Sequence, residues 1–274
     1  MPEHEILPPF PGSAVPHVGT YRRVLPVNLE RMYENALDWA HLPFVHRSSF
    51  SAITCIEEGS WGWRAQVSGA GGAQSVIELR LDRVCRRWIT RNLAGPSMGA
   101  EIWTHVFNLE PADSYERLEI VVDFFIPGVE AQAREKVGRS YANQYKTLYD
   151  EDVAMMVARQ KQLDRRVEGV RAERGRCELG SRSELKLPLN CTVGGRDYVV
   201  VEEAGEMLAF PARCPHRLGP LTAANLEDGV VECGWHGYRF DVRTGECLTG
   251  QPCRLSNTPV LSEHNGIWAL TVEP

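Results

Sequence analysis

The tripeptide Cys-Pro-His at residues 214–216 and the tetrapeptide Cys-Gly-Trp-His at residues 233–236 decide the fold of the C-terminal part of this chain. Each peptide offers one thiolate and one imidazole, so the candidate ligands are Cys214, His216, Cys233 and His236. Two cysteines and two histidines suit a two-iron, two-sulfide cluster in which the cysteines hold one iron and the histidines the other. Structural zinc is the alternative, but zinc modules more often take like ligands from each loop.

Turn-forming residues surround both ligand pairs. They recur at five positions in and beside the two peptides: Pro215, Gly219, Pro220, Gly234 and Gly237. Such residues allow tight turns that bring backbone N–H groups close to sulfur atoms, which stabilises the more negative, reduced state of a cluster. The pattern therefore predicts two short loops that hold an electron-transfer cluster.

The two loops closely resemble those of the Rieske iron–sulfur domain. High-potential Rieske proteins carry two further loop cysteines joined in a disulfide, and those places are filled here by Pro220 or its neighbours and by Trp235. The resemblance is therefore to the lower-potential ferredoxin and oxygenase type. Cys247 and Cys253 lie beyond the second loop and are interpreted as small, buried or partly exposed thiols.

The composition fits a globular protein with two domains. A chain of 274 residues with 43% hydrophobic residues can bury a core in each of two modest domains. The formal net charge of −6 argues against a surface for nucleic acid or anionic membrane. No run of about 18 apolar residues and no export signal is present, so we expect a cytoplasmic protein outside the membrane.

Hydrophobic periodicity gives the order of the elements. Residues 1–27 are rich in proline and glycine and are expected to form an extended arm. Asn28 caps a helix that should end at Pro43. Short strands are expected between residues 53 and 125, followed by a long helix over residues 130–166. This order favours a sheet curled around the final helix, with an internal cavity.

The expected fold class is α+β. Residues 28–166 should form a helix-grip domain, which is an antiparallel sheet around a long C-terminal helix. Residues 167–183 are charged and interrupted by glycines, so a linker is expected there. Residues 184–274 should form a small all-β domain that carries the cluster loops.

A second set of candidate ligands lies where the first helix ends. Asp38 and His41 are three residues apart and share a helical face, and Pro43 turns the chain so that His46 can fold back toward His41. Histidines at this spacing are more often structural or surface residues. The electron-transfer cluster changes this interpretation in favour of metal ligands, because a redox metal in the same chain could receive the electrons of the cluster.

Two histidines need a carboxylate to complete the facial triad of non-haem iron(II), which leaves the opposite coordination face open. The acidic triplet at residues 150–152 of the long helix supplies candidates, and an ordinary solvated helix face is the alternative. Asp152 lies on the same stripe as the inward-facing Leu148 and Met156. Asp152 is therefore the expected third ligand, and Glu151 is the second candidate.

Residues 34–46 resemble the iron-binding region of Rieske non-haem iron oxygenases, and residues 149–153 with Gln160 resemble the closing helix of that family. The match is to the single-component hydroxylase and O-demethylase branch. It implies that Asp38 lies between the cluster of one subunit and the iron of its neighbour. It also implies that a mononuclear Fe(2+) is held by His41, His46 and Asp152.

The resemblance implies an oxygenase that takes electrons from a separate reductase or ferredoxin and uses O2 to hydroxylate or demethylate a small apolar or aromatic molecule. Six aromatic residues fit such a pocket, although they are more often plain core: Phe44, Trp61, Trp63, Trp88, Trp103 and Phe124. Family members usually place the Rieske domain first, whereas here it is last. A homo-oligomer is expected, a trimer by the resemblance.

A function of another class stays open. The first domain could be an iron-free ligand carrier fused to a Rieske ferredoxin-like electron carrier. Metal analysis separates the two hypotheses, because an oxygenase holds one mononuclear iron in addition to the two cluster irons. Structural zinc in the loops would give a colourless protein, whereas the cluster gives a red-brown one.

Overall fold

Seven antiparallel strands and a long helix make up most of the first of two units in the computed structural model, which describes residues 15–109, 117–167, 174–256 and 258–272. The units are Met1–Val157 and Ala158–Pro274. In the first unit the strand order is β1-β7-β6-β5-β4-β3-β2. The strands are β1 His17–Leu25, β2 Phe50–Gly59, β3 Gly62–Gly69, β4 Gln74–Asp82, β5 Arg87–Ala94, β6 Glu101–Asn108 and β7 Leu118–Phe125.

Strands β1 and β2 differ from the sequence prediction. Residues 17–25, expected in an extended arm, form β1 and pair antiparallel with β7 along its whole length. The sequence did not predict this strand for two reasons. Its own apolar residues alternate only over a short stretch, and the residues before it are rich in proline and glycine. Strand β2 begins at Phe50, three residues before the region where strands were expected, and its mostly exposed residues give no two-residue alternation that would mark its start. Residues 110–113, Glu-Pro-Ala-Asp, have the composition of a turn but lie outside the described residues.

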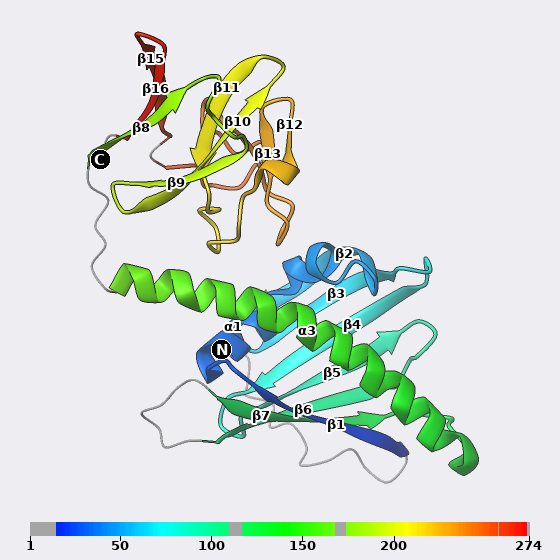
Figure 1. Cartoon of the computed structure of the whole chain (residues 1–274). Coiled ribbons are helices and arrows are strands. Elements are labelled where there is room, and N and C mark those ends of the chain that lie inside the picture. The colour runs from blue at the N-terminus through cyan, green and yellow to red at the C-terminus, as the bar shows by residue number, and fades with distance from the viewer. Residues whose placement is uncertain (1–14, 110–116, 168–173, 257, 273–274) are drawn as a thin grey trace. The chain divides into compact units, whose positions relative to one another are not determined.

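Helix α3, Arg134–Val167, follows a short 3-10 turn at Ala131–Ala133 and runs across one face of the sheet (Figure 1). Gly138 lets this helix approach β1 closely, because a Cβ atom at Gly138 would lie 2.1 Å from the carbonyl oxygen of Val18. The prediction of a helix-grip domain is therefore confirmed. Among the described helices, none has the length and apolar character needed to cross a membrane.

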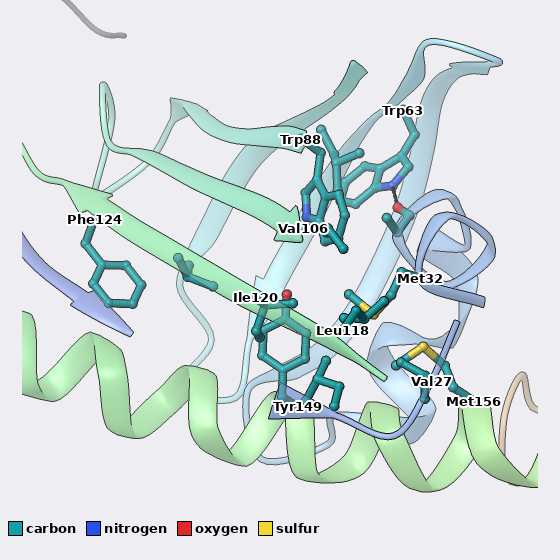
Figure 2. Close-up of a cluster of buried hydrophobic side chains, with 14 of the residues drawn as sticks. Val27, Met32, Trp63, Trp88, Val106, Leu118, Ile120, Phe124, Tyr149 and Met156 are labelled. Atoms are coloured by element: carbon teal, nitrogen blue, oxygen red, sulfur yellow. Dashed lines mark hydrogen bonds between the residues drawn. The ribbon is translucent and has the colours of Figure 1, made fainter. Parts of the chain in front are cut away.

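The core of the first unit fills the space between the sheet and the helices (Figure 2). Its buried side chains include Trp63, Trp88, Phe124, Tyr149 and Met156. Trp63 is fixed further, since its Nε1 donates a hydrogen bond to the carbonyl oxygen of Ala36 across 2.9 Å. Three of the six candidate pocket aromatics thus belong to this core: Trp63, Trp88 and Phe124. Trp103 belongs to a separate cluster with Ile89 and Phe125.

The first helix is shorter than predicted. Helix α1 covers Leu29–Leu37, and the side chain of Asn28 caps it by accepting a hydrogen bond from the backbone N of Arg31 at 2.9 Å. A 3-10 turn at Trp39–His41 and the short helix α2, Leu42–Val45, follow. Pro43 was expected to end the helix, but it lies in the first turn of α2, where a missing N–H costs no hydrogen bond.

The second unit is all-β apart from the last turns of α3 and a 3-10 turn at Ala223–Asn225, as predicted for the C-terminal domain. Three small sheets have the orders β11-β10-β9, β12-β13-β14 and β15-β16-β8. Their strands are β8 Gly175–Ser181, β9 Leu189–Val193, β10 Arg196–Glu203, β11 Glu206–Pro211, β12 Leu226–Glu227, β13 Val230–Glu232, β14 Arg239–Asp241, β15 Val260–His264 and β16 Ile267–Val272.

Strand β8 corrects the predicted linker. Residues 167–183 were expected to connect the two domains, but residues 175–181 within them pair antiparallel with β16. Glycines at both ends of this strand produced the linker-like composition. The backbone explains the glycine at position 180. Its φ is positive, 112°, a conformation that other residues rarely adopt. It also lies where the ladder with β16 shifts register, at Trp268/Ala269.

Candidate metal centres

Three buried side chains of the first unit converge on one point. Nε2 of His41 lies 3.2 Å from Nε2 of His46, and Oδ1 of Asp152 lies 3.4 Å from the first and 3.0 Å from the second. The three residues are 3%, 2% and 8% exposed, so water has little access to them. The structure thus brings together the two histidines and the carboxylate that the sequence singled out.

The local chain path explains why the two histidines meet. His41 ends the 3-10 turn after α1, and His46 caps the C-terminus of α2. The backbone N of His46 donates to the carbonyl oxygen of Leu42 across 3.0 Å, which closes the turn between the two rings. Asp152 reaches them from α3, one turn after the core residue Tyr149.

Two neighbours hold the orientation of these side chains. Nδ1 of His46 lies 2.7 Å from Oε2 of Glu151, and Nδ2 of Asn35 donates a hydrogen bond to Oδ1 of Asp152 across 2.9 Å. Glu151, the second candidate for the third ligand, therefore contacts the far nitrogen of His46 and not the point of convergence. A carboxylate on the outer nitrogen of a ligating histidine is typical of metal sites, because it fixes the ring and its tautomer.

The electrostatics of the cluster favour a charged carboxylate. Burial alone would raise the pKa of Asp152, but hydrogen bonds and charges from His41 and His46 lower this pKa well below its usual range. Burial lowers the pKa of His46, and the carboxylates of Asp152 and Glu151 more than offset it, so the net shift is upward. The site therefore attracts positive charge to the space between the three side chains.

The ligand geometry fits a metal ion. Donor atoms about 2.0–2.2 Å from one ion lie about 3.0 Å apart on an octahedral face and about 3.4 Å apart in a tetrahedron, and the three observed separations fall in this range. Nδ1 of His41 is buried and has no hydrogen-bond partner among the described residues. Imidazole and carboxylate donors suit iron(II), and a three-ligand set leaves further coordination positions open.

Asp38 lies beside this cluster in the sequence but does not belong to it. It is the C-terminal cap of α1, where its backbone N donates to the carbonyl oxygen of Asn35 across 3.1 Å. Its φ and ψ of −89° and 77° are not helical, so Asp38 and His41 do not share one helix. The side chain of Asp38 is partly exposed.

The four predicted cluster ligands lie in two loops of the second unit. Cys214 and Cys233 are each 1% exposed. The imidazole rings of His216 and His236 are 4.5 Å apart at an interplanar angle of 77°. Each ligand pair thus consists of like side chains from different loops, as a two-iron cluster requires.

Backbone hydrogen bonds shape both loops. The N of Cys214 donates to the carbonyl oxygen of Gly219, and the N of Cys233 donates to that of Tyr238, each across 2.8 Å. A Cβ atom at Gly219 would lie 2.9 Å from the Trp235 ring and 3.1 Å from Sγ of Cys233. Glycine at this position therefore lets the first loop approach the second.

The two cysteine thiols have pKa values shifted in opposite directions. A hydrogen bond from Cys214 lowers the pKa of the Cys233 thiol, and the same contact, together with burial, raises the pKa of Cys214. Two buried thiols in contact can exchange their protons for a metal ion, which binds thiolates. The sulfur pair therefore fits one iron of a cluster.

Comparison with known proteins identifies this second site. Residues 175–259 match the Rieske [2Fe-2S] domain family. The C-terminal part of the chain is therefore a Rieske [2Fe-2S] domain, and the predicted resemblance to Rieske oxygenases with this domain last is confirmed.

Several curated proteins share short segments with the chain. The 4beta-methylsterol monooxygenase of Methylococcus capsulatus is 33% identical over 92 residues, which is 29% of this chain and 25% of that protein. The chloroplastic pheophorbide a oxygenase of Oryza sativa is 40% identical over 55 residues, 19% of this chain and 10% of that protein. The ferredoxin component of the naphthalene 1,2-dioxygenase system of Pseudomonas putida is 37% identical over 60 residues, 22% of this chain and 58% of that protein. The chain thus spans only a minor part of the two oxygenases.

Solved structures resemble about half of the chain. An aromatase/cyclase, Zhui, from Streptomyces sp. R1128 is 15% identical and covers 53% of this chain and 95% of its own, with a TM-score of 0.40. A START superfamily protein from Mycobacterium smegmatis is 10% identical and covers 54% of this chain and 99% of its own, with a TM-score of 0.41.

The sequence analysis did not single out two further residues, one beside each site. Asn35 precedes Asp38 by one helical turn, and this spacing put it on the face that meets α3, but an amide carries no strong signal for a ligand partner. Tyr238 stacks on His216, with ring centroids 4.6 Å apart and an interplanar angle of 19°. Its place two residues after His236 could have indicated a ring that supports the ligand histidines.

Proposed function

We propose that this protein is the oxygenase component of a Rieske-type non-haem iron system. The observation that carries the proposal is the convergence of His41, His46 and Asp152 in a chain that also has a Rieske domain. A [2Fe-2S] cluster can store one electron, and a redox metal with open coordination positions can use that electron. The division into a catalytic domain and a cluster domain is part of this proposal.

In the proposed site His41 and His46 supply Nε2 and Asp152 supplies Oδ1 to one iron(II) ion. Bound there, iron(II) supplies the activation of O2 toward a C–H bond or an aromatic ring. Glu151 holds the tautomer of His46, and Asn35 holds the rotamer of Asp152. The low exposure of the three ligands keeps bulk water away from them.

Asp38 is proposed to connect the two centres. A carboxylate can accept hydrogen bonds from two imidazoles at once, and Asp38 lies three residues before His41. By the family resemblance the second imidazole belongs to a cluster of a neighbouring subunit, His216 or His236. A homo-oligomer, with a trimer as the expected form, is therefore part of this proposal.

The partners follow from the two centres. A Rieske domain needs an electron donor, for which we propose a separate reductase or ferredoxin. The substrate is proposed to be a small apolar or aromatic molecule, since apolar and aromatic side chains dominate the inner face of the sheet.

Metal analysis of the anaerobically purified chain tests the proposal. We expect two cluster irons and one mononuclear iron per chain, with a red-brown colour. The variant D152A should lose the mononuclear iron and keep the colour, whereas D150N should keep all the iron, because Asp150 is half-exposed and pairs with Arg23 and Lys146. Wild-type protein with only the cluster irons would instead support a Rieske electron carrier fused to an iron-free ligand-binding domain.

A further inference from the structure

Two cysteines behind the second cluster loop face one another. An isolated antiparallel bridge joins Glu246 to Arg254, the residue before Cys247 and the residue after Cys253. A side-chain hydrogen bond joins the two thiols. Both cysteines are free and partly exposed. The two thiols therefore already meet, as the formation of a disulfide requires.

The surroundings make the two thiols unequal. Sγ of Cys247 lies 3.3 Å from Oγ1 of Thr249 and 3.6 Å from Oε1 of Gln251. Burial raises the pKa of Cys247, but hydrogen bonds from Thr249, from the backbone of Gln251 and from the Cys253 thiol lower it overall. Burial and the Cys247 charge raise the pKa of Cys253 to about 11. Cys247 is thus the thiol that ionises first, and Cys253 stays protonated beside it.

We propose that Cys247 and Cys253 form a thiol-oxidation site that closes a reversible disulfide when hydrogen peroxide reaches it. The Cys247 thiolate attacks one peroxide oxygen, the O–O bond breaks, and hydroxide leaves as Cys247 becomes a sulfenic acid. The sulfur of Cys253 then attacks Cys247, its proton goes to the departing oxygen, and one water is released with the disulfide. Peroxide is reduced by two electrons, and the two thiols are oxidised by two.

The site is tied to the strand that leaves the second cluster loop. Cys247 forms a bridge with Phe240, and the N of Leu248 donates to the carbonyl oxygen of Arg239 across 2.8 Å. The N of Asp241 donates to the carbonyl oxygen of Glu246 across 3.0 Å. A disulfide would therefore fasten the segment that backs β14, which begins three residues after His236. This inference does not depend on the proposed oxygenase activity.

Peptide mapping of the intact holoprotein tests the inference. Cleavage after Arg243 and Arg254 gives a peptide of residues 244–254 that contains both cysteines. The protein is treated with limited hydrogen peroxide under native conditions, and free thiols are then alkylated before digestion. Reduced protein should give the peptide with both cysteines alkylated. Oxidised protein should give it with no alkylation and two hydrogens fewer, and a thiol reductant should restore both labels.

Cys85 is the internal control, because it is exposed and its hydrogen bond to Asp82 raises its pKa, so it should remain alkylatable. The variant C253S should accumulate a sulfenic acid on Cys247 that a dimedone reagent traps, whereas C247S should leave Cys253 alkylatable. The visible spectrum of each variant reports whether the cluster domain is folded. A wild-type peptide that keeps both labels, or in which Cys247 is oxidised without bridging, would overturn the inference.

Discussion

Glu151 and His46 form a hydrogen-bonded pair in which Oε2 of the carboxylate lies 2.7 Å from Nδ1 of the ring. The other ring nitrogen, Nε2, lies 3.0 Å from Oδ1 of Asp152. When Nδ1 donates its hydrogen to Glu151, the lone pair of the neutral ring is left on Nε2. The neighbouring acidic residues of α3 therefore have different tasks, one at each end of the same imidazole.

We expect the variant E151A to bind mononuclear iron(II) about 10–100-fold more weakly, the usual effect of losing such a partner of a ligand histidine. E151Q should lie between wild type and E151A, because an amide oxygen still accepts the hydrogen bond but carries no charge. The dissociation constant from anaerobic iron titration measures the effect, and D150N is the matched control one residue away. An unchanged constant in E151A would show that His46 needs no help from Glu151.

The variant D38N should keep both kinds of iron while electron transfer from the cluster to the mononuclear site collapses. In the amide an NH2 donor replaces one of the two acceptor oxygens and the negative charge is lost, so it bridges two imidazole N–H groups far less well than a carboxylate does. Reducing the cluster and following its reoxidation in a single turnover with O2 measures the transfer. Metal analysis of the same sample separates this outcome from loss of iron, and normal single turnover would remove Asp38 from the path.

Sequence reasoning succeeded where a local pattern is tied to one structure. The cluster loops of Cys214 and Cys233 are short and carry their own turn residues, so their form follows from neighbours in the chain. The stripe on α3 placed Asp152 on the face that meets the helices and Glu151 beside it. Helical periodicity thus indicated which of the two carboxylates lies between the histidines, while the binding of iron by Asp152 stays a prediction.

The rest depends on contacts between distant residues. Strand β1 is stabilised by pairing with β7, which lies about a hundred residues later in the chain. The sequence of residues 17–25 alone does not indicate that partner. The hydrogen bond from Asn35 to Asp152 likewise joins α1 to α3. The contact between the thiols of Cys247 and Cys253 could not be predicted either, because it lies in an irregular segment whose sequence has no periodic pattern.

Gly138 should be a position that tolerates no side chain. In G138A the new methyl group would meet the Val18 carbonyl oxygen at 2.1 Å and Cα of Gly19 at 3.1 Å, so α3 must move off β1. We expect a net loss of about 1–3 kcal/mol in the free energy of unfolding from overpacking, after alanine's better helix propensity of about 1 kcal/mol has been counted.

Denaturant unfolding of the metal-loaded protein measures the effect of G138A. The matched control is G71A, because a Cβ atom at Gly71 would have open space around it. G71A should leave the free energy of unfolding within about 0.5 kcal/mol of wild type. Equal stability of G138A and wild type would mean that the helix and β1 do not pack as closely as the geometry indicates.

Glu78 should make the stability of the first unit sensitive to acid. Its side chain is 4% exposed, and Oε2 accepts a hydrogen bond from Nη2 of Arg64 across 2.6 Å while Oε1 accepts one from Nε of Arg80 across 2.8 Å. Burial raises the pKa of Glu78, but the two guanidinium groups outweigh it, so its pKa in the folded protein is below the ordinary value of 4.5. A lowered folded-state pKa stabilises the fold above that ordinary value, and this stabilisation is lost as the pH falls through the folded-state pKa.

The variant E78Q should therefore unfold about 1–3 kcal/mol more easily than wild type at neutral pH, since its amide keeps one acceptor oxygen but loses the negative charge and the second acceptor that the two guanidinium groups contact. The difference between the free energies of unfolding of the two proteins should narrow as the pH falls below 4.5 and through the folded-state pKa, because Glu78 takes up a proton first in the unfolded chain and then in the folded protein. Urea unfolding at a series of pH values measures it. The control is E57Q, because Glu57 is exposed and its contact with Arg64 is long, 3.5 Å. An equal loss of stability in E57Q and E78Q at neutral pH would contradict the special role of Glu78.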